Sequence, residues 1–313
     1  MPRVARKHLV DRRKGGFHHC LNLISGYPGE YPFHNPLVVA DFIARLRACV
    51  LRSRIHCAGF ALMGNHFHLV LFGERLRRLS RRKLERHAKA RWGKLWKLRT
   101  RHWSDERWER FNADLFELSL FMKDLQGPFA TWFNKVFRHW GRLWAGRFKS
   151  LALGNDLAAV HEQLLYVELN PVRAGLAALP EHYVAGSAYL RSVGKAGWLI
   201  PLERLFPDLP RSKAAPFHRA LLLHRGLLPT RERQASIPEE VAARELERRF
   251  PPGLYRRRRR FMIDGLMMGS KDRMLRELER LTLEGVYRRR RNVKEHWDGL
   301  FHTIREQRSH YTR

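Results

Sequence analysis

The sequence predicts an α+β fold, and three stretches carry that prediction. Residues 16–25 (GFHHCLNLIS) follow a glycine pair and have the composition of a strand. Residues 55–72 (IHCAGFALMGNHFHLVLF) form two strand-like pieces around Gly64 and Asn65, a dipeptide typical of a tight hairpin. Between them, residues 37–53 place apolar side chains at helical spacing, including Val39, Phe42 and Leu46. Strands that alternate with helices in this way indicate an antiparallel sheet with packed helices.

The other elements follow from local signals. Asn35 and Pro36 have the chemistry of a helix cap and a first helical residue. Residues 114–141 have a helical pattern with an expected break or kink near Gly127 and Pro128. Residues 142–154 have strand character, Asn155 or Asp156 caps a helix over 157–170, and Pro171 opens a short helical piece.

The chain divides into two predicted regions. Residues 1–190 form the first, with a strongly basic, helix-permissive insertion at about 74–111. Residues 191–313 form a basic, mostly helical C-terminal region with arginine blocks after Tyr255 and Tyr287. We expect this second region to bind DNA. The insertion is either a DNA-contacting arm, with Trp92, Trp96 and Trp103 among its charges, or a solvated helical hairpin.

The charge balance indicates a polyanionic partner. Sixty-one Lys and Arg oppose thirty Asp and Glu, a formal net charge of +31 that destabilises a compact chain unless anions screen it. Nucleic acid is the expected partner, because nine Trp and eighteen Phe could stack on unpaired bases. An acidic membrane surface is the alternative.

Several protein classes are excluded. The three cysteines, Cys20, Cys49 and Cys57, have no C-x-x-C spacing, so neither a disulfide framework nor a zinc finger is expected. The apolar runs are too short to cross a bilayer, and the N-terminus lacks the apolar core of a signal peptide. These features predict a cytoplasmic protein with no membrane partner.

Two histidines stand out within the predicted hairpin. His66 and His68 point to one side of their strand and Phe67 to the other, because side chains alternate along a strand. Two imidazoles at this spacing can bind one divalent ion but do not complete its coordination. Histidines in a strand can equally be structural.

The helix over residues 157–170 has two faces. Leu157, Val160, Leu164 and Val167 form an apolar stripe, whereas Glu162, Tyr166 and Asn170 follow at i, i+4 and i+8 on another face. Tyr166 is therefore expected on the polar face of an amphipathic helix. The plain alternative is a boundary tyrosine with its hydroxyl in water, and Asn170 is equally a cap before Pro171.

Taken together, MGNHFHLVLF (63–72), GRLWAGRFKS (141–150) and LLYVELNPVRAGL (164–176) resemble the single-tyrosine HUH transposases. The motif Y-x-x-x-N-P-V is most similar to the branch of REP-associated tyrosine transposases, which recognise DNA hairpins. The resemblance covers residues 1–190 and implies a ferredoxin-like or RRM-like antiparallel sheet with helices on one face. It also requires the helix that carries Tyr166 to lie against the histidine face.

The resemblance implies a role for each matching residue. His66 and His68 correspond to the histidine pair that holds magnesium or manganese, Tyr166 to the nucleophile, and Asn170 to the polar residue that completes the metal site. The implied reaction is metal-dependent nicking and joining of single-stranded DNA at hairpins through a covalent 5′-phosphotyrosine. Gly64 departs from the family, since many members have proline there, and the basic insertion is longer than usual.

The same resemblance implies the partners. Single-stranded or hairpin DNA is the expected ligand of a nucleoid-associated protein, and some relatives exchange the tyrosine helix within a homodimer. The expected contacts to the DNA backbone are Arg138, Arg142, Arg147, Lys149, Arg256, Arg257, Arg258, Arg259 and Arg260. Surface solubility is the alternative for each. A catalytically silent hairpin-binding protein and a phosphodiesterase without a covalent step are the competing functions.

Overall fold

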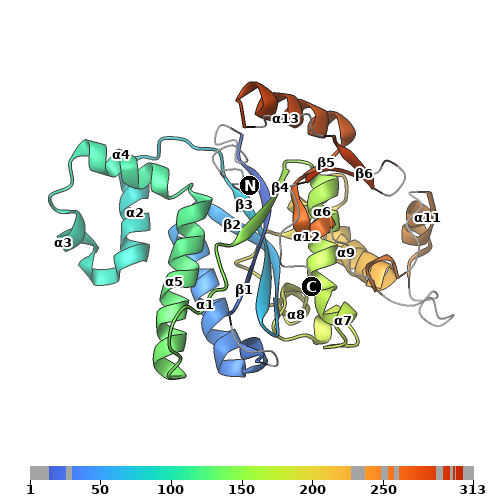
Figure 1. The fold of residues 1–313 in the computed structure, drawn as a ribbon, viewed down its shortest axis with the longest axis horizontal. Helices are drawn as coiled ribbons and strands as arrows, with labels where there is room; N and C mark the ends of the chain where they lie inside the picture. Colours follow the sequence, from blue (N-terminus) through green and yellow to red (C-terminus); the bar gives the residue numbers. More distant parts are fainter. Residues whose placement is uncertain are drawn as a thin grey trace.

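A computed structural model describes residues 14–25, 30–226, 237–247, 253–256, 261–286, 292–296, 299 and 301–305. These residues build a seven-stranded sheet in the order β2-β3-β1-β4-β5-β7-β6 (Figure 1). The strands are β1 (Gly16–Leu23), β2 (Ile55–Met63), β3 (His66–Gly73), β4 (Lys149–Gly154), β5 (Gly265–Gly269), β6 (Lys294–His296) and β7 (Phe301–Arg305). Every neighbouring pair is antiparallel except β4 and β5, which are parallel.

Helices surround the sheet. They are α1 (Pro36–Arg52), α2 (Arg81–Trp92), α3 (Trp96–Thr100), α4 (Asp105–Asp114), α5 (Leu118–Val136), α6 (Leu157–Glu168), α7 (Asn170–Arg173), α8 (Ser187–Ser192), α9 (Arg211–Gly226), α11 (Glu239–Glu247), α12 (Phe261–Asp264) and α13 (Lys271–Leu283). Short 3₁₀ turns include η2 (Pro32–His34) and η6 (Leu254–Arg256). The expected α+β class is therefore confirmed. None of the helices within the described ranges is both long and apolar enough to cross a membrane.

The predicted hairpin is present, and its register places the histidines. Residues 64 and 65 connect β2 to β3, and β1 pairs with the other edge of β3. His68 lies opposite Leu21 and Ala61, and His66 lies opposite Leu23 and Met63. Both histidines are thus on an inner strand of the N-terminal half of the sheet, with His66 at the end of β3 next to the turn.

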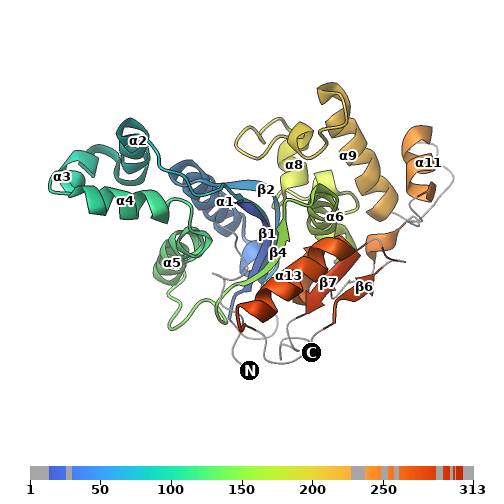
Figure 2. The same ribbon diagram turned by 90° about the horizontal axis from the view of Figure 1, so that it is seen from above.

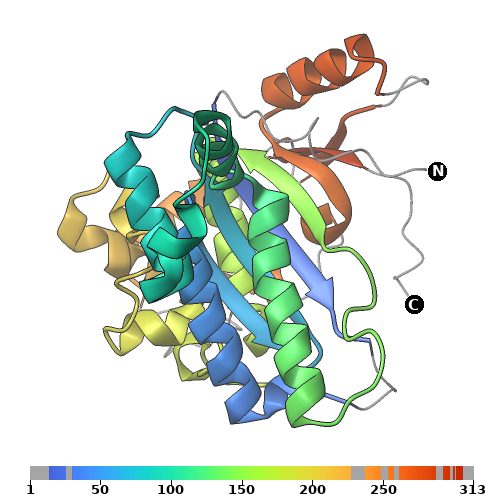
Figure 3. The same ribbon diagram turned by 90° about the vertical axis from the view of Figure 1, so that its left-hand side faces the viewer.

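One face of the sheet is covered by α1 and α5, which lie side by side across the strands in Figure 3. Phe67 points into this layer, with its ring 5.2 Å from Phe42 and 5.5 Å from Trp144. Asn35 caps α1 as expected, because its side chain accepts a hydrogen bond from the Leu37 N–H at 2.9 Å. Helix α5 runs through Pro128 without the expected break.

The other face is covered by α6 and the helices around it, so the sheet lies between two helical layers (Figure 2). The expectation of helices on one face is therefore wrong. The cause is visible along β3, where Phe67, Leu69 and Leu71 alternate with His68 and Val70 and all of them are buried. A strand that is apolar on both sides has to be covered on both sides.

The C-terminal region supplies β5, β6 and β7, which the sequence did not predict. These strands continue the N-terminal sheet through β4, where Ala152 pairs with Met267. The segment GLMMG is only five residues long and is bounded by glycines, so it lacks a clear alternating pattern. The predicted boundary near residue 190 stays a prediction.

The basic insertion is a small helical unit with its own core. Leu84, Ala88, Trp108 and Phe111 are buried there, and Trp92, Trp96 and Trp103 pack against them. The three tryptophans that marked a DNA-contacting arm in the sequence thus have a packing role. The cations of α2 and α3 remain on the outside.

Candidate active site

The histidine pair lies on the sheet face that α6 covers. The ring centroids of His66 and His68 are 5.1 Å apart, so both rings are near enough to bind one ion. His68 is 2% exposed, whereas His66, at the beginning of β3, is half-buried. The pair therefore opens towards solvent at the β2–β3 turn.

Tyr166 reaches the same face from α6. Its ring centroid is 6.5 Å from that of His68, which is the arrangement the resemblance requires. The tyrosine is fully buried, with the Arg173 guanidinium 4.6 Å above its ring and the Tyr255 ring at 5.8 Å. The alternative interpretation of Tyr166 as a boundary tyrosine with its hydroxyl in water is therefore wrong, because the C-terminal region covers the face of α6 that was expected to be polar.

Asn170 begins α7 and is also fully buried. Its side chain does not cap that helix, since the N-cap is Leu169. The Oδ1 atom of Asn170 accepts a hydrogen bond from the Arg173 guanidinium, while its Nδ2 atom has no hydrogen-bond partner among the described residues. Arg173 thus links Asn170 to the ring of Tyr166.

His19 on β1 is a part of this site that the sequence interpretation missed. Its Nε2 lies 2.9 Å from Nδ1 of His68, and its Nδ1 lies 3.1 Å from the carbonyl oxygen of Met262. The carbonyl can only accept, whereas the Gln163 amide nitrogen, also 3.1 Å from Nδ1 of His19, can only donate, so a proton on Nδ1 satisfies Met262 and a proton on Nε2 satisfies Gln163. With the proton on Nδ1, the Nε2 atom of His19 accepts from the Nδ1–H of His68. Burial lowers the pKa of His19 to about 4, and the Met262 hydrogen bond only partly opposes this.

These contacts bear on the tautomers of the histidine pair. When His19 carries its proton on Nδ1, His68 carries its own proton on Nδ1, and His66 donates from Nδ1 to the Asn65 Oδ1 at 3.0 Å. In that state Nε2 is the metal-binding nitrogen of each ring, the form in which imidazole binds metal. The signal in the sequence was His19 itself, which has the same strand parity as Leu21, the residue opposite His68.

The donor set fits a divalent ion in part. The described residues contain no cluster of three or more His, Cys, Asp or Glu side chains suited to a metal. The two imidazoles supply nitrogen ligands, which manganese accepts more readily than magnesium, and oxygen ligands must complete the coordination. Asn170 has the right oxygen, but Arg173 occupies it.

A network of buried salt bridges connects the C-terminal region to α6. Arg225, fully buried on α9, binds Glu162 of α6 at 2.7 Å and also Glu245 of α11. The hydroxyl of Tyr255 donates to Glu162 at 2.6 Å. Burial raises the pKa of Tyr255, and the neighbouring Glu162 carboxylate raises it further. Tyr255, which packs against the Tyr166 ring, is thus itself hydrogen-bonded to α6 through Glu162.

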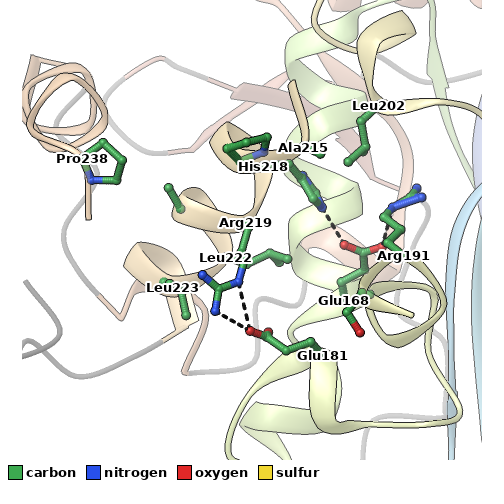
Figure 4. Close-up of a pocket in the computed structure, with 14 residues that line it drawn as sticks. Glu168, Glu181, Arg191, Leu202, Ala215, His218, Arg219, Leu222, Leu223 and Pro238 are labelled. Carbon is green, nitrogen blue, oxygen red and sulfur yellow. Dashed lines mark hydrogen bonds and ion pairs between the residues drawn. The ribbon is translucent and has the colours of Figure 1, made fainter. Parts of the chain in front are cut away.

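A cavity of about 510 Å³ lies on another side of α6 (Figure 4). Glu168 points into it and accepts hydrogen bonds from His218 at 2.6 Å and Ser187 at 2.5 Å. Burial raises the pKa of Glu168, but His218, Arg191 and Ser187 together hold it below its ordinary value. The cavity walls are otherwise mostly apolar, and none of the predicted site residues lines it.

The predicted DNA contacts have different positions. Arg138, Arg142 and Arg147 are exposed between α5 and β4, and Lys149 is half-buried at the start of β4. For Arg256 the structure describes only the backbone, in η6, and Arg257, Arg258, Arg259 and Arg260 lie outside the described residues.

No family model and no curated protein matches this chain. Among solved structures, the chain is similar to a REP-associated tyrosine transposase bound to a REP hairpin, with a TM-score of 0.37 and 12% sequence identity. The match covers 58% of this chain and 82% of that chain. A TM-score this low carries no argument about function, so any functional proposal has to rest on the residues of the site.

Proposed function

We propose that this protein nicks and joins single-stranded DNA at hairpins, with Tyr166 as the nucleophile. The observation that supports this most directly is the ring of Tyr166 at 6.5 Å from His68, on the face that the histidine pair shares. The two residues come from distant parts of the sequence, and a purely structural role does not require a tyrosine beside the histidine pair.

The reaction begins at the hydroxyl of Tyr166. Its oxygen attacks the phosphorus, the bond from phosphorus to the 3′-oxygen breaks, and the departing oxygen becomes a 3′-hydroxyl by taking up a proton. An ordinary tyrosine has a pKa of about 10, so its proton must leave during the attack. The resulting 5′-phosphotyrosine conserves the energy of the bond. A 3′-hydroxyl of a second strand then reverses the step and joins the strands without ATP.

Arg173 is suited to assist this chemistry. Its guanidinium lies 4.6 Å from the Tyr166 ring and binds the Asn170 oxygen, so a positive charge is already next to the nucleophile. A guanidinium at this point stabilises negative charge on a phenolate and on phosphate oxygens. Asn170 orients Arg173 and thereby acts as a positioning residue in the arrangement described.

The proposed metal is a magnesium or manganese ion on His66 and His68. When bound, such an ion polarises the phosphate and stabilises the charge that develops on its oxygens. The contacts of His68 with His19 and of His66 with Asn65 support this assignment, because with the His19 proton on Nδ1 both imidazoles are in the tautomer that can hold such an ion. Asn170 joins the donor set only when Arg173 releases its oxygen.

Access to Tyr166 requires movement. The tyrosine is fully buried, and the Tyr255 and Arg173 side chains stand over its ring. DNA reaches the hydroxyl only after these side chains are displaced. The same burial favours a second candidate function, a hairpin-binding protein that has no cleavage activity.

The test is to incubate the protein with a single-stranded palindromic oligonucleotide and manganese and to separate the products on a denaturing gel. We expect a covalent protein–DNA adduct that is absent for Tyr166→Phe and unchanged for Tyr189→Phe, a tyrosine of the opposite core. The double variant His66→Ala, His68→Ala should lose cleavage and keep binding.

Three other outcomes of this experiment would contradict the proposal or support a competing function. An adduct that survives in Tyr166→Phe overturns the assignment of the nucleophile. Cleavage without any adduct supports a phosphodiesterase. Tight hairpin binding with no cleavage under any divalent metal supports the silent binding protein.

A further inference from the structure

The segment between α5 and β4, residues 137–148, exposes a tryptophan. Trp140 is 91% exposed, the highest value for a large apolar side chain among the described residues. Four residues later, Trp144 is buried and donates from its indole N–H to the carbonyl oxygen of Gln126 at 3.0 Å. One tryptophan therefore anchors the segment, and the other is left in solvent.

The exposed tryptophan sits on a braced loop. The Asn134 amide donates to the Gly141 carbonyl at 3.0 Å and its oxygen lies 3.2 Å from Nδ1 of His139. Arg138 has a φ of 50°, and among the described residues it is the one non-glycine residue with a positive φ. Such a conformation is costly, and the bonds around it keep the loop in one shape.

The loop lies at the end of the sheet where the histidine pair opens. The Ser25 N–H donates to the Leu143 carbonyl at 2.6 Å, and the Ala145 N–H donates to Leu23, the residue opposite His66. The neighbouring Ile24 N–H donates to Asn65 at 2.8 Å, in the turn before His66. The loop is therefore joined by hydrogen bonds to the strand end that lies next to His66.

The charge of the segment suits a phosphate chain. No acidic residue occurs between Asp124 and Asp156, whereas Lys135, Arg138 and Arg142 flank the tryptophan. All three cations are exposed. An aromatic face among uncompensated cations is the combination that binds unpaired nucleotides, because the ring stacks on a base while the cations neutralise phosphates.

We propose that Trp140 stacks on an unpaired base in the single-stranded DNA that flanks a hairpin, with Arg138 and Arg142 at the adjacent phosphates. This rests on the proposed function and specifies which part of the substrate the loop binds. Stacking makes the site tolerant of base identity, so the loop recognises the single-stranded character of the flank and not its sequence.

The experiment measures binding alone, by fluorescence anisotropy in EDTA with Tyr166→Phe protein, so that no cleavage occurs. Two labelled oligonucleotides are compared, a hairpin with single-stranded flanks and the same hairpin with a blunt end. Trp140→Ala should weaken binding of the flanked hairpin by about fivefold to a hundredfold, the range for loss of one stacked base. It should leave the blunt hairpin unchanged, and Trp140→Phe should restore most of the affinity.

Two controls separate stacking from charge and from general surface effects. Leu283→Ala removes another highly exposed apolar side chain, 82% exposed, and should change neither affinity. Arg142→Gln should reduce the dependence of affinity on salt by about 0.7 in the logarithmic slope, the value for one phosphate of a single strand. Trp140→Ala should leave that slope unchanged.

Equal affinity of Trp140→Ala and its parent for the flanked hairpin overturns the proposal, and so does equal weakening for both oligonucleotides. If the unmutated protein still forms a covalent adduct, only this inference fails. If the protein binds neither oligonucleotide, the proposed function fails as well.

Discussion

Single contacts decide what the histidine pair can do. His66 and His68 point to one side of a strand in any sheet, but their usefulness as ligands depends on which nitrogen carries the proton. His19 and Asn65 contact the Nδ1 atoms of His68 and His66 at 2.9 and 3.0 Å, and the proton on His19 decides which nitrogen of His68 is protonated. Gly64 has a local reason too, since a Cβ there would lie 2.5 Å from the Tyr31 ring.

Replacing His19 tests the tautomer argument. His19→Phe removes the acceptor for the Nδ1–H of His68, and we expect the affinity for Mn²⁺ to fall by about tenfold to a hundredfold. The measurement is the free Mn²⁺ signal in electron paramagnetic resonance, without DNA. His19→Gln, which keeps an acceptor, should recover part of the affinity. His56→Phe, a histidine bonded to Glu74, is the matched control and should have no effect.

The cysteines give a second prediction at this scale. Burial raises the pKa of Cys49 and of Cys57 to about 12, so both thiols stay protonated at neutral pH. Cys20 is fully buried, and none of the three cysteines is in a disulfide. A thiol reagent such as DTNB should label none of them in the native protein and all of them in guanidinium chloride. Rapid labelling of the native protein contradicts this.

Among the helices and strands, α6 differs most from what the sequence predicted. It was expected to be amphipathic, but the residues from Ala159 to Glu168 are all buried. The sheet covers one side and the C-terminal helices cover the other. Its approach to β2 is close at Gly59, where an added Cβ would collide with Leu164 and lie 2.8 Å from the Ser187 hydroxyl oxygen.

We therefore expect Gly59→Ala to lower the free energy of unfolding by about 1–3 kcal/mol, because the extra methyl overpacks the contact between β2 and α6. Urea denaturation measures it. The matched control is Gly197→Ala, in the loop after α8, where an added Cβ meets nothing within 4 Å apart from its chain neighbours. That variant should be neutral or more stable by up to about 1 kcal/mol. Equal stability of the two variants contradicts the close approach of α6.

At the scale of the whole molecule, distant segments combine into one structure. The C-terminal strands continue the N-terminal sheet, and Arg225 connects α9 to both α6 and α11. Two buried carboxylates, Glu162 and Glu245, face this one guanidinium. Such a buried network is costly to break from one side, because the partners lose their compensating charge.

Arg225→Met should lower the free energy of unfolding by about 3–5 kcal/mol, since it leaves two buried carboxylates without their cation. The comparison is Arg219→Met, which removes an exposed pairing with Glu181 and should cost no more than about 1 kcal/mol. Thermal denaturation of both variants in one buffer is the measurement. Similar melting temperatures would show that Arg225 does not hold the C-terminal region in place.

Two buried carboxylates also predict how stability depends on pH. Burial raises the pKa of Glu168 and of Glu245, but the contact of Glu168 with His218 and those of Glu245 with His224 and Arg225 hold each pKa below the ordinary value of 4.5. A carboxyl with a lowered folded-state pKa stabilises the protein above its unfolded pKa, and this stabilisation is lost as pH falls through the folded value. The melting temperature should therefore drop steeply below pH 4.5, and less steeply in Glu168→Gln. An equal slope in that variant contradicts the assignment.

Much of the N-terminal architecture could be predicted from local signals. The glycine-led strand β1, the hairpin at Gly64 and Asn65 and the Asn35 cap all appear where the sequence placed them, and of the two caps it offered for α6 the structure has Asp156. The C-terminal strands could not be predicted, because short strands that extend an existing sheet depend on a partner far away in the sequence. The second helical layer was not predicted either. The pattern of side chains along β3 did not show by itself that both of its sides are buried, and burial of both sides requires helices on both faces.

By itself, the sequence determined the local spacing of the proposed site residues: His66 and His68 on one side of a strand, and Tyr166 and Asn170 one helical turn apart. Periodicity decides such relations, because neighbours within one element keep their spacing in any fold. Only the tertiary structure brought Tyr166 to His68, added His19 with its bond to Met262, placed Arg173 on the Asn170 oxygen and buried the tyrosine under Tyr255. These relations join segments that are far apart in the chain, and their distances are decided by how the elements pack.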